Sequence, residues 1–149
     1  MTKDEFFQEA DLTTTGPLDG LVVLEACTTY AGPVAAAELG DMGATVIKCE
    51  LPGSGDICRA FGPRVPNAPD LDRGAPFLSI NRNKKAITLN FHHPQGQEMF
   101  RQLARQADIV VQNFRPGTMD TWHIGYNDIR EVKPDIVYVS ISCLGQWGP

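Results

Sequence analysis

The chain has 149 residues, of which 42% are hydrophobic and 21% are charged, and its formal net charge at pH 7 is -5. This balance predicts one ordinary soluble globular domain that is long enough to bury a core. The acidic charge argues against a general binder of nucleic acid or membrane surfaces, and no apolar run approaches the roughly 20 residues needed to span a bilayer. We expect residues 1–15 to form a flexible N-terminal arm that lacks the order of a secretory signal, and residues 16–149 to fold.

The first predicted elements lie between Leu21 and Glu50. Residues 21–26 and 45–50 are apolar runs typical of strands that are covered on both faces. Between them, Gly32-Pro33 predicts the start of a helix, because proline needs no amide donor in the first turn, and Gly43 predicts its end. This order indicates a right-handed parallel crossover, and ligands of such sheets bind at the carboxyl ends of the strands.

Three more strands are predicted in the rest of the chain. Residues 52–76 show no period and indicate a long loop, after which residues 86–91 form the third strand. His93 and Pro94 predict the start of an amphipathic helix. The remaining predicted elements are strands over 108–113 and 135–142 and short helices over 118–122 and 127–133, with Asn127 as a helix cap. Strands that alternate with helices predict an α/β fold with a parallel sheet.

The cysteines indicate the compartment and argue against a metal site. Cys27, Cys49, Cys58 and Cys143 lie far apart and form no CxxC pair. This usage is typical of a reducing cytoplasm, where thiols pack as small hydrophobic groups. No cysteine or histidine spacing resembles a zinc site, so we expect no bound metal.

Two stretches are candidates for binding an anionic ligand. The segment CTTYAGP after the first strand lacks the glycines of the GxGxxG fingerprint, which argues against an ordinary NAD site. The run NRNKK at residues 81–85 has two interpretations, a solvated turn or a local phosphate site. After the fourth strand, NFRPG places Asn113 and Arg115 at the carboxyl edge, whereas Phe114 is either a ligand contact or a core residue.

Other reactive side chains are better explained by structural roles, so no catalytic residue is assigned. The three histidines have no serine or cysteine arranged around them in sequence, which favours surface or capping positions. Cys27 has no sequence neighbour that would lower its pKa, so we expect it to pack. Three aspartates are expected as caps, turn residues and solvated charges: Asp41, Asp56 and Asp120.

Taken together, the motifs resemble those of class III CoA-transferases, a family that includes formyl-CoA and carnitine CoA-transferases and the related α-methylacyl-CoA racemases. They are AGPxAAAxLGDMGAxVIKCExPGSGD, NRNKK, PQGxxxFxxLxxxADIVVQNFRPG and PDIVYVSISxxGQWGP, in this order over residues 16–149. The resemblance implies the Rossmann-like large domain of that family, truncated before its small domain. It also implies acyl-CoA and a carboxylic acid acceptor as substrates, no permanently bound cofactor, and the homodimer that full-length members form.

The resemblance further implies that CoA contacts come from the segments that follow four of the strands. The matching positions are Tyr30 and Ala31; Leu89, Asn90, Phe91 and His92; Asn113, Phe114 and Arg115; and Ser142, Cys143, Leu144 and Gly145.

Three positions depart from the pattern of the formyl-CoA transferase subgroup. Leu51, His92 and Thr121 stand where that subgroup has two arginines and a lysine, so we expect fewer cationic contacts to the phosphates of CoA. Four residues could compensate: Arg82, Lys84, Lys85 and Arg115.

The resemblance places the catalytic groups of the family beyond the GQWGP segment. In the transferases an aspartate there attacks the thioester and forms a mixed anhydride, and the racemases use acid–base residues that also lie beyond it. We therefore expect no transferase turnover from this chain alone. Three functions stay open: the CoA-binding part of a CoA-transferase, as a fragment or a subunit that a C-terminal chain completes; a racemase-type fragment; or a non-catalytic nucleotide-binding or interaction module.

Overall fold

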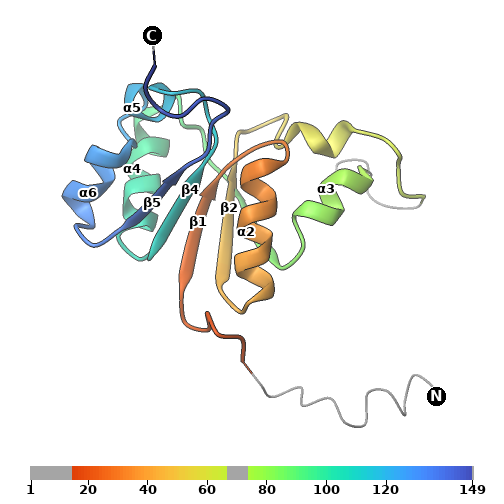
Figure 1. The fold of residues 1–149 in the computed structure, drawn as a ribbon. Helices are drawn as coiled ribbons and strands as arrows, with labels where there is room; N and C mark the ends of the chain where they lie inside the picture. Colours follow the sequence, from red (N-terminus) through yellow and green to blue (C-terminus); the bar gives the residue numbers. More distant parts are fainter. Residues whose placement is uncertain (1–14, 67–73, 149) are drawn as a thin grey trace.

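The computed structural model describes residues 15–66 and 74–148 (Figure 1). The arm predicted over residues 1–15 lies almost wholly outside these ranges, as does the middle of the predicted loop 52–76.

Five strands form a single sheet in the described part of the chain. They are β1 (Val22–Ala26), β2 (Thr45–Glu50), β3 (Lys84–Thr88), β4 (Ile109–Gln112) and β5 (Val137–Ser140). Their order is β3-β2-β1-β4-β5, and each neighbouring pair is parallel. The predicted parallel α/β sheet is therefore confirmed. The strand order reverses at β1, and a ligand crevice is expected where β1 and β4 diverge at their carboxyl ends.

Helices cover both faces of this sheet, as predicted. They are α2 (Ala31–Asp41), the 3₁₀ turn η1 (Ile57–Ala60), α3 (Ala75–Ile80), α4 (Pro94–Ala104), α5 (Thr118–Thr121) and α6 (Tyr126–Val132). Figure 1 shows α2 on one face and α4, α5 and α6 on the other, with α3 beyond α2.

The two faces bury cores of different composition. The core under α4, α5 and α6 contains large side chains such as Leu24, Phe91 and Phe100. The core under α2 is thinner and contains Val23, Ala36 and other small residues. The alanines of α2 allow this helix to lie close to the sheet, because small side chains leave little volume between the two layers.

Two of the predicted helix starts and two predicted strands differ from the structure, and the fifth strand, β5, covers 137–140 rather than 135–142. The third strand is β3 at 84–88 rather than 86–91, because the ammonium group of Lys84 is buried in an ion pair with Glu25 at 2.8 Å. The first helix begins at Ala31, ahead of Gly32-Pro33. The last helix begins at Tyr126 with Gly125 as its cap, rather than after Asn127.

Other helix boundaries agree with the sequence. The Nδ1 atom of His93 accepts a hydrogen bond from the backbone N–H of Gln95 at 3.2 Å, and Pro94 is the first residue of α4. Gly43 follows α2 with a φ of +104°, a left-handed conformation that favours glycine. These residues therefore set the start of α4 and the end of α2.

Candidate functional site

A groove of about 530 Å³ opens at the carboxyl edge of the sheet, at the switch point between β1 and β4. Its walls come from the start of α2 and from the segments that follow β4 and β5, and its lining is mainly apolar. The lining residues are Ala31, Asn113, Phe114, Arg115, Pro116, Ile141, Ser142, Cys143, Leu144 and Gly145. Three of the four segments that the family resemblance implies as CoA contacts thus meet at one cavity.

The fourth segment, Leu89 to His92, lies next to the groove but does not line it. The side chains of Leu89 and Phe91 are buried in the core, and the ring of Phe91 meets that of Phe114 edge to face at 6.4 Å. His92 is exposed and its ring contacts Trp122 at 4.9 Å. This segment supports the groove wall from behind, through the aromatic contact with Phe114.

Tyr30 and Asn90 complete the set of predicted residues. Tyr30 is half-exposed and caps the start of α2, directly before Ala31 in the groove wall. Asn90 is exposed, and its Oδ1 atom accepts a hydrogen bond from the backbone N–H of His92 at 3.0 Å. Neither side chain lines the cavity.

The side-chain amide of Asn113 holds the β1–α2 loop (residues 27–30). Its Oδ1 accepts from the N–H of Thr28 at 2.9 Å, and its Nδ2 donates to the carbonyl of Thr28 at 2.7 Å. A Cβ at Gly32 would overlap Cys27 and approach Asn113, so this close packing needs glycine. The amide of Asn113 therefore shapes the groove by fixing the loop.

A buried charge cluster lies behind the same loop and consists of Glu25, Lys48, Lys84 and Asp56. The Nζ atom of Lys48 lies 2.8 Å from Glu25 Oε1 and 3.0 Å from Asp56 Oδ2. The Nζ atom of Lys84 lies 2.8 Å from Glu25 Oε2. All four side chains are almost fully buried, so each charge depends on its partner within the cluster.

The pKa values of the lysines and of Cys27 follow from this burial. Desolvation lowers the pKa of Lys48, but the carboxylates of Glu25 and Asp56 outweigh it and leave that pKa raised. For Lys84 desolvation outweighs the attraction of Glu25, and its pKa is lowered. Burial, helped by the charge of Glu25, raises the pKa of Cys27 well above its ordinary value. Cys27 is therefore a protonated packing thiol at neutral pH, as predicted.

The prediction that Asp56 is a solvated charge is wrong, although its predicted role as a cap is confirmed. Only 1% of Asp56 is exposed. Its Oδ1 atom accepts from the N–H of Cys58 at 3.0 Å at the start of η1, and also from the N–H of Thr29 at 3.0 Å. The sequence places Asp56 in a glycine-rich loop, where a turn residue is normally solvated.

A second ion pair ties the loop after β2 to the end of that strand. Arg59 Nε donates to Glu50 Oε2 at 2.8 Å, and the N–H of Asp56 donates to the same oxygen at 2.7 Å. Burial raises the pKa of Glu50, but these hydrogen bonds and the charge of Arg59 outweigh it and leave the pKa lowered. Glu50 is thus committed to the fold at the position where a ribose-binding acid would stand in a dinucleotide site.

The NRNKK run is largely accounted for by ion pairs within the chain. Arg82 donates to Asp41 at 2.8 Å and to Glu38 at 3.1 Å on the surface of α2, and Lys84 is part of the buried charge cluster. The phosphate-site interpretation of this run therefore loses two of its three cations. Arg115, by contrast, is exposed in the groove wall, and no described residue forms a hydrogen bond or ion pair with its guanidinium group.

The three positions without the cations of the subgroup have structural contacts here. Leu51 packs against the larger core. The hydroxyl of Thr121 donates to the carbonyl of Gly117 at 2.9 Å. His92, as described above, contacts Trp122. None of the three places a permanent positive charge at the groove.

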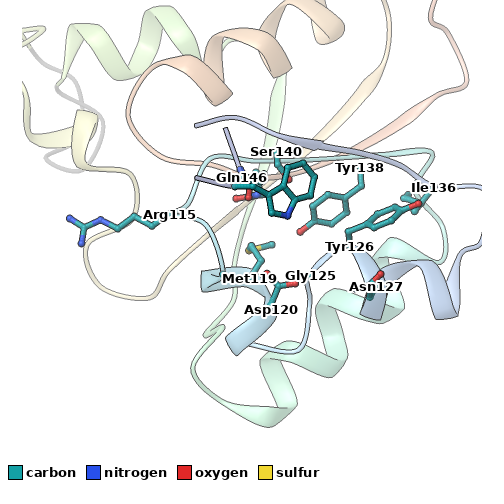
Figure 2. A pocket seen from close by; sticks show the side chains of 13 residues that line it. Arg115, Met119, Asp120, Gly125, Tyr126, Asn127, Ile136, Tyr138, Ser140 and Gln146 are labelled. Carbon is teal, nitrogen blue, oxygen red and sulfur yellow. The ribbon is translucent and has the colours of Figure 1, made fainter. Parts of the chain in front are cut away.

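A second cavity, of about 600 Å³, lies between the ends of β4 and β5 and helices α5 and α6 (Figure 2). Figure 2 shows Tyr126 and Tyr138 side by side in its wall and Arg115 pointing away from it. The hydroxyl of Tyr138 donates to the carbonyl of Ile124 at 3.1 Å, and burial raises its pKa. The sequence analysis did not predict this cavity, because its lining is brought together by the turns between short helices.

Within residues 15–66 and 74–148, no helix is both long enough and apolar enough to cross a membrane. The same ranges contain no group of three or more histidine, cysteine, aspartate or glutamate side chains placed to hold a metal ion.

The buried charge cluster is the part of the site that the sequence analysis missed. A signal was present, because Glu25 and Lys48 interrupt two apolar strands with opposite charges and occupy paired positions in the register. Charged residues inside covered strands are rare unless they are paired. The contribution of Asp56 had no such signal, since it enters the cluster from a loop.

Comparison with known proteins shows similarity to one family over nearly the whole chain. The family model described as CoA-transferase family III matches residues 18–149. A human protein named succinyl-CoA:glutarate CoA-transferase is 40% identical over 141 residues, which are 95% of this chain and 31% of that protein. The beta subunit of a succinyl-CoA–L-malate CoA-transferase from Chloroflexus aurantiacus is 39% identical over 92% of this chain and 33% of its own.

Solved structures agree with these matches. The crystal structure of a CAIB/BAIF family protein from Brucella suis superposes with a TM-score of 0.83 at 37% identity, covering 91% of this chain and 36% of that one. The chain thus spans about a third of the length of the relatives that it matches.

Proposed function

The chain belongs to CoA-transferase family III, and on that premise we propose that it is the CoA-binding part of an enzyme that transfers CoA between an acyl-CoA thioester and a carboxylic acid. The groove at the β1–β4 switch point is the proposed CoA site. The proposed contacts are the thirteen positions that the family resemblance implies, with the segment from Leu89 to His92 contributing mainly through its backbone and its support of Phe114.

One observation carries this proposal. The groove gathers Ala31, the Asn113–Arg115 segment and the Ser142–Gly145 segment, which are far apart in sequence and which the family resemblance implies as CoA contacts. Its apolar lining suits a long, flexible pantetheine-like chain, and Arg115 offers an uncommitted guanidinium for a phosphate at its rim. Acyl-CoA and an acid acceptor are proposed as substrates because the relatives are named for such reactions.

We propose no catalytic step for the isolated chain. The resemblance assigns the nucleophilic aspartate to a part of the family that follows the GQWGP segment. Asp56 offers no replacement because it is buried in ion pairs, and neither does Asp41, which ends α2 at the opposite edge of the sheet and is bound to Arg82. A purified-protein assay with several acyl-CoAs and acceptor acids should detect no turnover, and turnover that Asp120→Asn abolishes would contradict this view.

The proposed partner is further polypeptide of the same family fold, in a homodimer or as a completing chain. The support is the face of β5 next to α2, where Val137 is 55% exposed and Val139 is 37% exposed. Parallel sheets are normally covered on both faces, so apolar side chains at this edge indicate a surface that another segment covers. A cytoplasmic location is also proposed, since the four cysteines are free thiols.

The test of CoA binding is calorimetry on the purified chain. We expect weak binding of CoA that decreases with added salt, and NAD binding that is no tighter. Arg115→Ala should weaken CoA binding by about tenfold or more, because a charge-assisted hydrogen bond contributes about 1.5–3 kcal/mol. Arg105→Ala is the matched control, since Arg105 is an exposed arginine that follows α4 at the opposite edge of the sheet. Tight NAD binding, or equal effects of the two variants, would contradict the assignment.

A further inference from the structure

The β1–α2 loop has a backbone conformation that needs external support. Thr29 has a φ of +72°, in the left-handed region that residues with a side chain rarely adopt. The next residue, Tyr30, caps α2 without a side-chain hydrogen bond. The loop therefore does not hold its own shape, although it places Ala31 in the groove wall.

Asp56 and Lys48 supply that support from the side opposite Asn113. Asp56 Oδ1 accepts from the N–H of Thr29 at 3.0 Å, at the residue with the left-handed conformation. Lys48 Nζ donates to the carbonyl of Cys27 at 3.0 Å while it pairs with Asp56 Oδ2 at 3.0 Å. Each end of the Lys48–Asp56 ion pair thus binds the backbone of the loop.

The rest of the cluster extends this support to the start of α2. Glu25 lies between Lys48 and Lys84, and Lys84 Nζ donates to the carbonyl of Pro33 in the first turn of α2 at 2.7 Å. The cluster therefore fixes both the loop and the helix that follows it.

Because the charges of the cluster are buried, stability alone does not explain why they are present. Replacing a buried ion pair by apolar groups of similar volume is often neutral or favourable for stability, because desolvation offsets the attraction. An apolar pair would, however, leave the N–H of Thr29 and the carbonyl of Cys27 without these partners. The charged groups therefore hold the strained β1–α2 loop in one position.

We infer that Lys48 and Asp56 are positioning residues for ligand binding, which hold the β1–α2 loop in the conformation that completes the groove. The inference depends on the proposed function in one respect, which is that it takes CoA as the ligand of the groove. The position of the loop itself is a separate property and is measured separately.

The experiment compares two double variants that both remove the ion pair and keep the cluster's net charge unchanged. The first variant combines Lys48→Met with Asp56→Asn, and its asparagine oxygen can still accept from the N–H of Thr29. The second combines Lys48→Met with Asp56→Leu, and its leucine is of similar size but has no hydrogen-bond acceptor. The readouts are amide hydrogen exchange of Thr29 by NMR, CoA affinity by calorimetry, and the thermal midpoint. Asp108→Ala is the control, because Asp108 Oδ2 accepts from the N–H of Val22 at 2.9 Å at the other end of β1.

We expect the Leu variant to exchange the Thr29 amide at least about tenfold faster than the Asn variant, and to bind CoA at least about tenfold more weakly. Asp108→Ala should lower the thermal midpoint and leave both other readouts unchanged. Equal exchange and equal affinity in the two double variants would overturn the inference.

If the unmodified chain does not bind CoA, the proposed function fails and Thr29 exchange alone decides the positioning role. If the Leu variant does not fold, Asp56→Ser with Lys48→Met replaces it, since serine is too short to reach Thr29.

Discussion

The two loops that face each other across the groove are held in different ways. The β1–α2 loop is bound from both sides, by the amide of Asn113 and by the Lys48–Asp56 pair. Residues 141–148, after β5, form a second loop in which Ser142 Oγ donates to the carbonyl of Gly145 at 2.7 Å. Leu144 and Trp147 in that loop are 93% and 91% exposed. One wall is thus preorganised, whereas the other has few contacts within the described chain.

This difference indicates that the two walls of the groove contribute differently to ligand binding. A wall that is already fixed adds little ordering cost when a ligand binds, whereas an exposed loop must be ordered at that moment. We expect the held loop to set the shape of the site and the loop 141–148 to settle only against a ligand or against further polypeptide. Four measurements test this contrast, from the largest expected effect to the smallest, and a fifth, on the pH dependence of stability, follows from the first of them.

The largest expected contrast is between the thiols of Cys27 and Cys143, which lie in the two loops. Cys143 is exposed, while Cys27 is buried and its pKa is raised. We expect iodoacetamide to modify Cys143 at least about a thousandfold faster, because Cys27 reacts only after the loop or the domain opens. Peptide mass spectrometry over time measures both rates. Cys143→Ser should remove the fast site, and comparable rates in the native protein would contradict the contrast.

The raised pKa of Cys27 also predicts how stability depends on alkaline pH. The unfolded chain releases this proton near the ordinary thiol pKa of 9.0, whereas the folded chain retains it. Stability should therefore fall as pH rises above about 9. Urea unfolding between pH 7 and 10 measures this loss, which Cys27→Ala should reduce.

The second largest effect is expected for Asn113→Leu, which removes the clamp on Thr28. The N–H and the carbonyl of Thr28 would both lose their partner, so we expect the free energy of unfolding to fall by about 2–4 kcal/mol. Urea denaturation followed by circular dichroism measures it. Asn127→Leu changes an exposed asparagine on α6 and should cost less than about 0.5 kcal/mol. Similar losses in both variants would show that the clamp does not hold the loop.

A smaller effect is expected for Glu50→Gln, which weakens the support behind Asp56. Glu50 accepts from Arg59 and from the N–H of Asp56, and its pKa is lowered in the fold. The stability from these contacts is present above the ordinary pKa of 4.5 and is lost as pH falls below it. We expect a deficit of about 1–2 kcal/mol at pH 7 that shrinks as the solution is acidified below pH 4.5. A deficit that is constant down to pH 3 would rule out this account.

The smallest effect is expected for Ser142→Ala in the loop 141–148. It removes the exposed hydrogen bond to Gly145, and we expect a change in stability below about 0.5 kcal/mol. Thr121→Ala removes another exposed hydroxyl-to-carbonyl hydrogen bond and is the matched control. A loss of more than about 1 kcal/mol for Ser142→Ala alone would mean that this loop is held as firmly as the first.

The amino-acid sequence by itself determined the sheet and the edge where the groove lies. Continuous apolar runs predicted all five strands, although the third begins two residues earlier than predicted, and Pro94, His93 and Gly43 predicted helix boundaries, because these signals depend on local backbone chemistry. Parallel strands bring their carboxyl ends to one edge, so segments far apart in sequence could be assigned to one site. The motif resemblance then placed Ala31, Asn113–Arg115 and Ser142–Gly145 together, and the cavity contains them.

Only the tertiary structure decided which of these residues face the groove and which support it. Asn90 and the neighbouring buried Phe91 belong to one predicted segment, yet one side chain meets solvent and the other the core. Lys84 looked like a solvated or phosphate-binding cation, and Asp56 looked like a solvated turn residue, but both are buried in one charge cluster. The physical reason is that desolvation and ion pairing depend on which strands and loops come together in space, and that information is not local to any segment of the sequence.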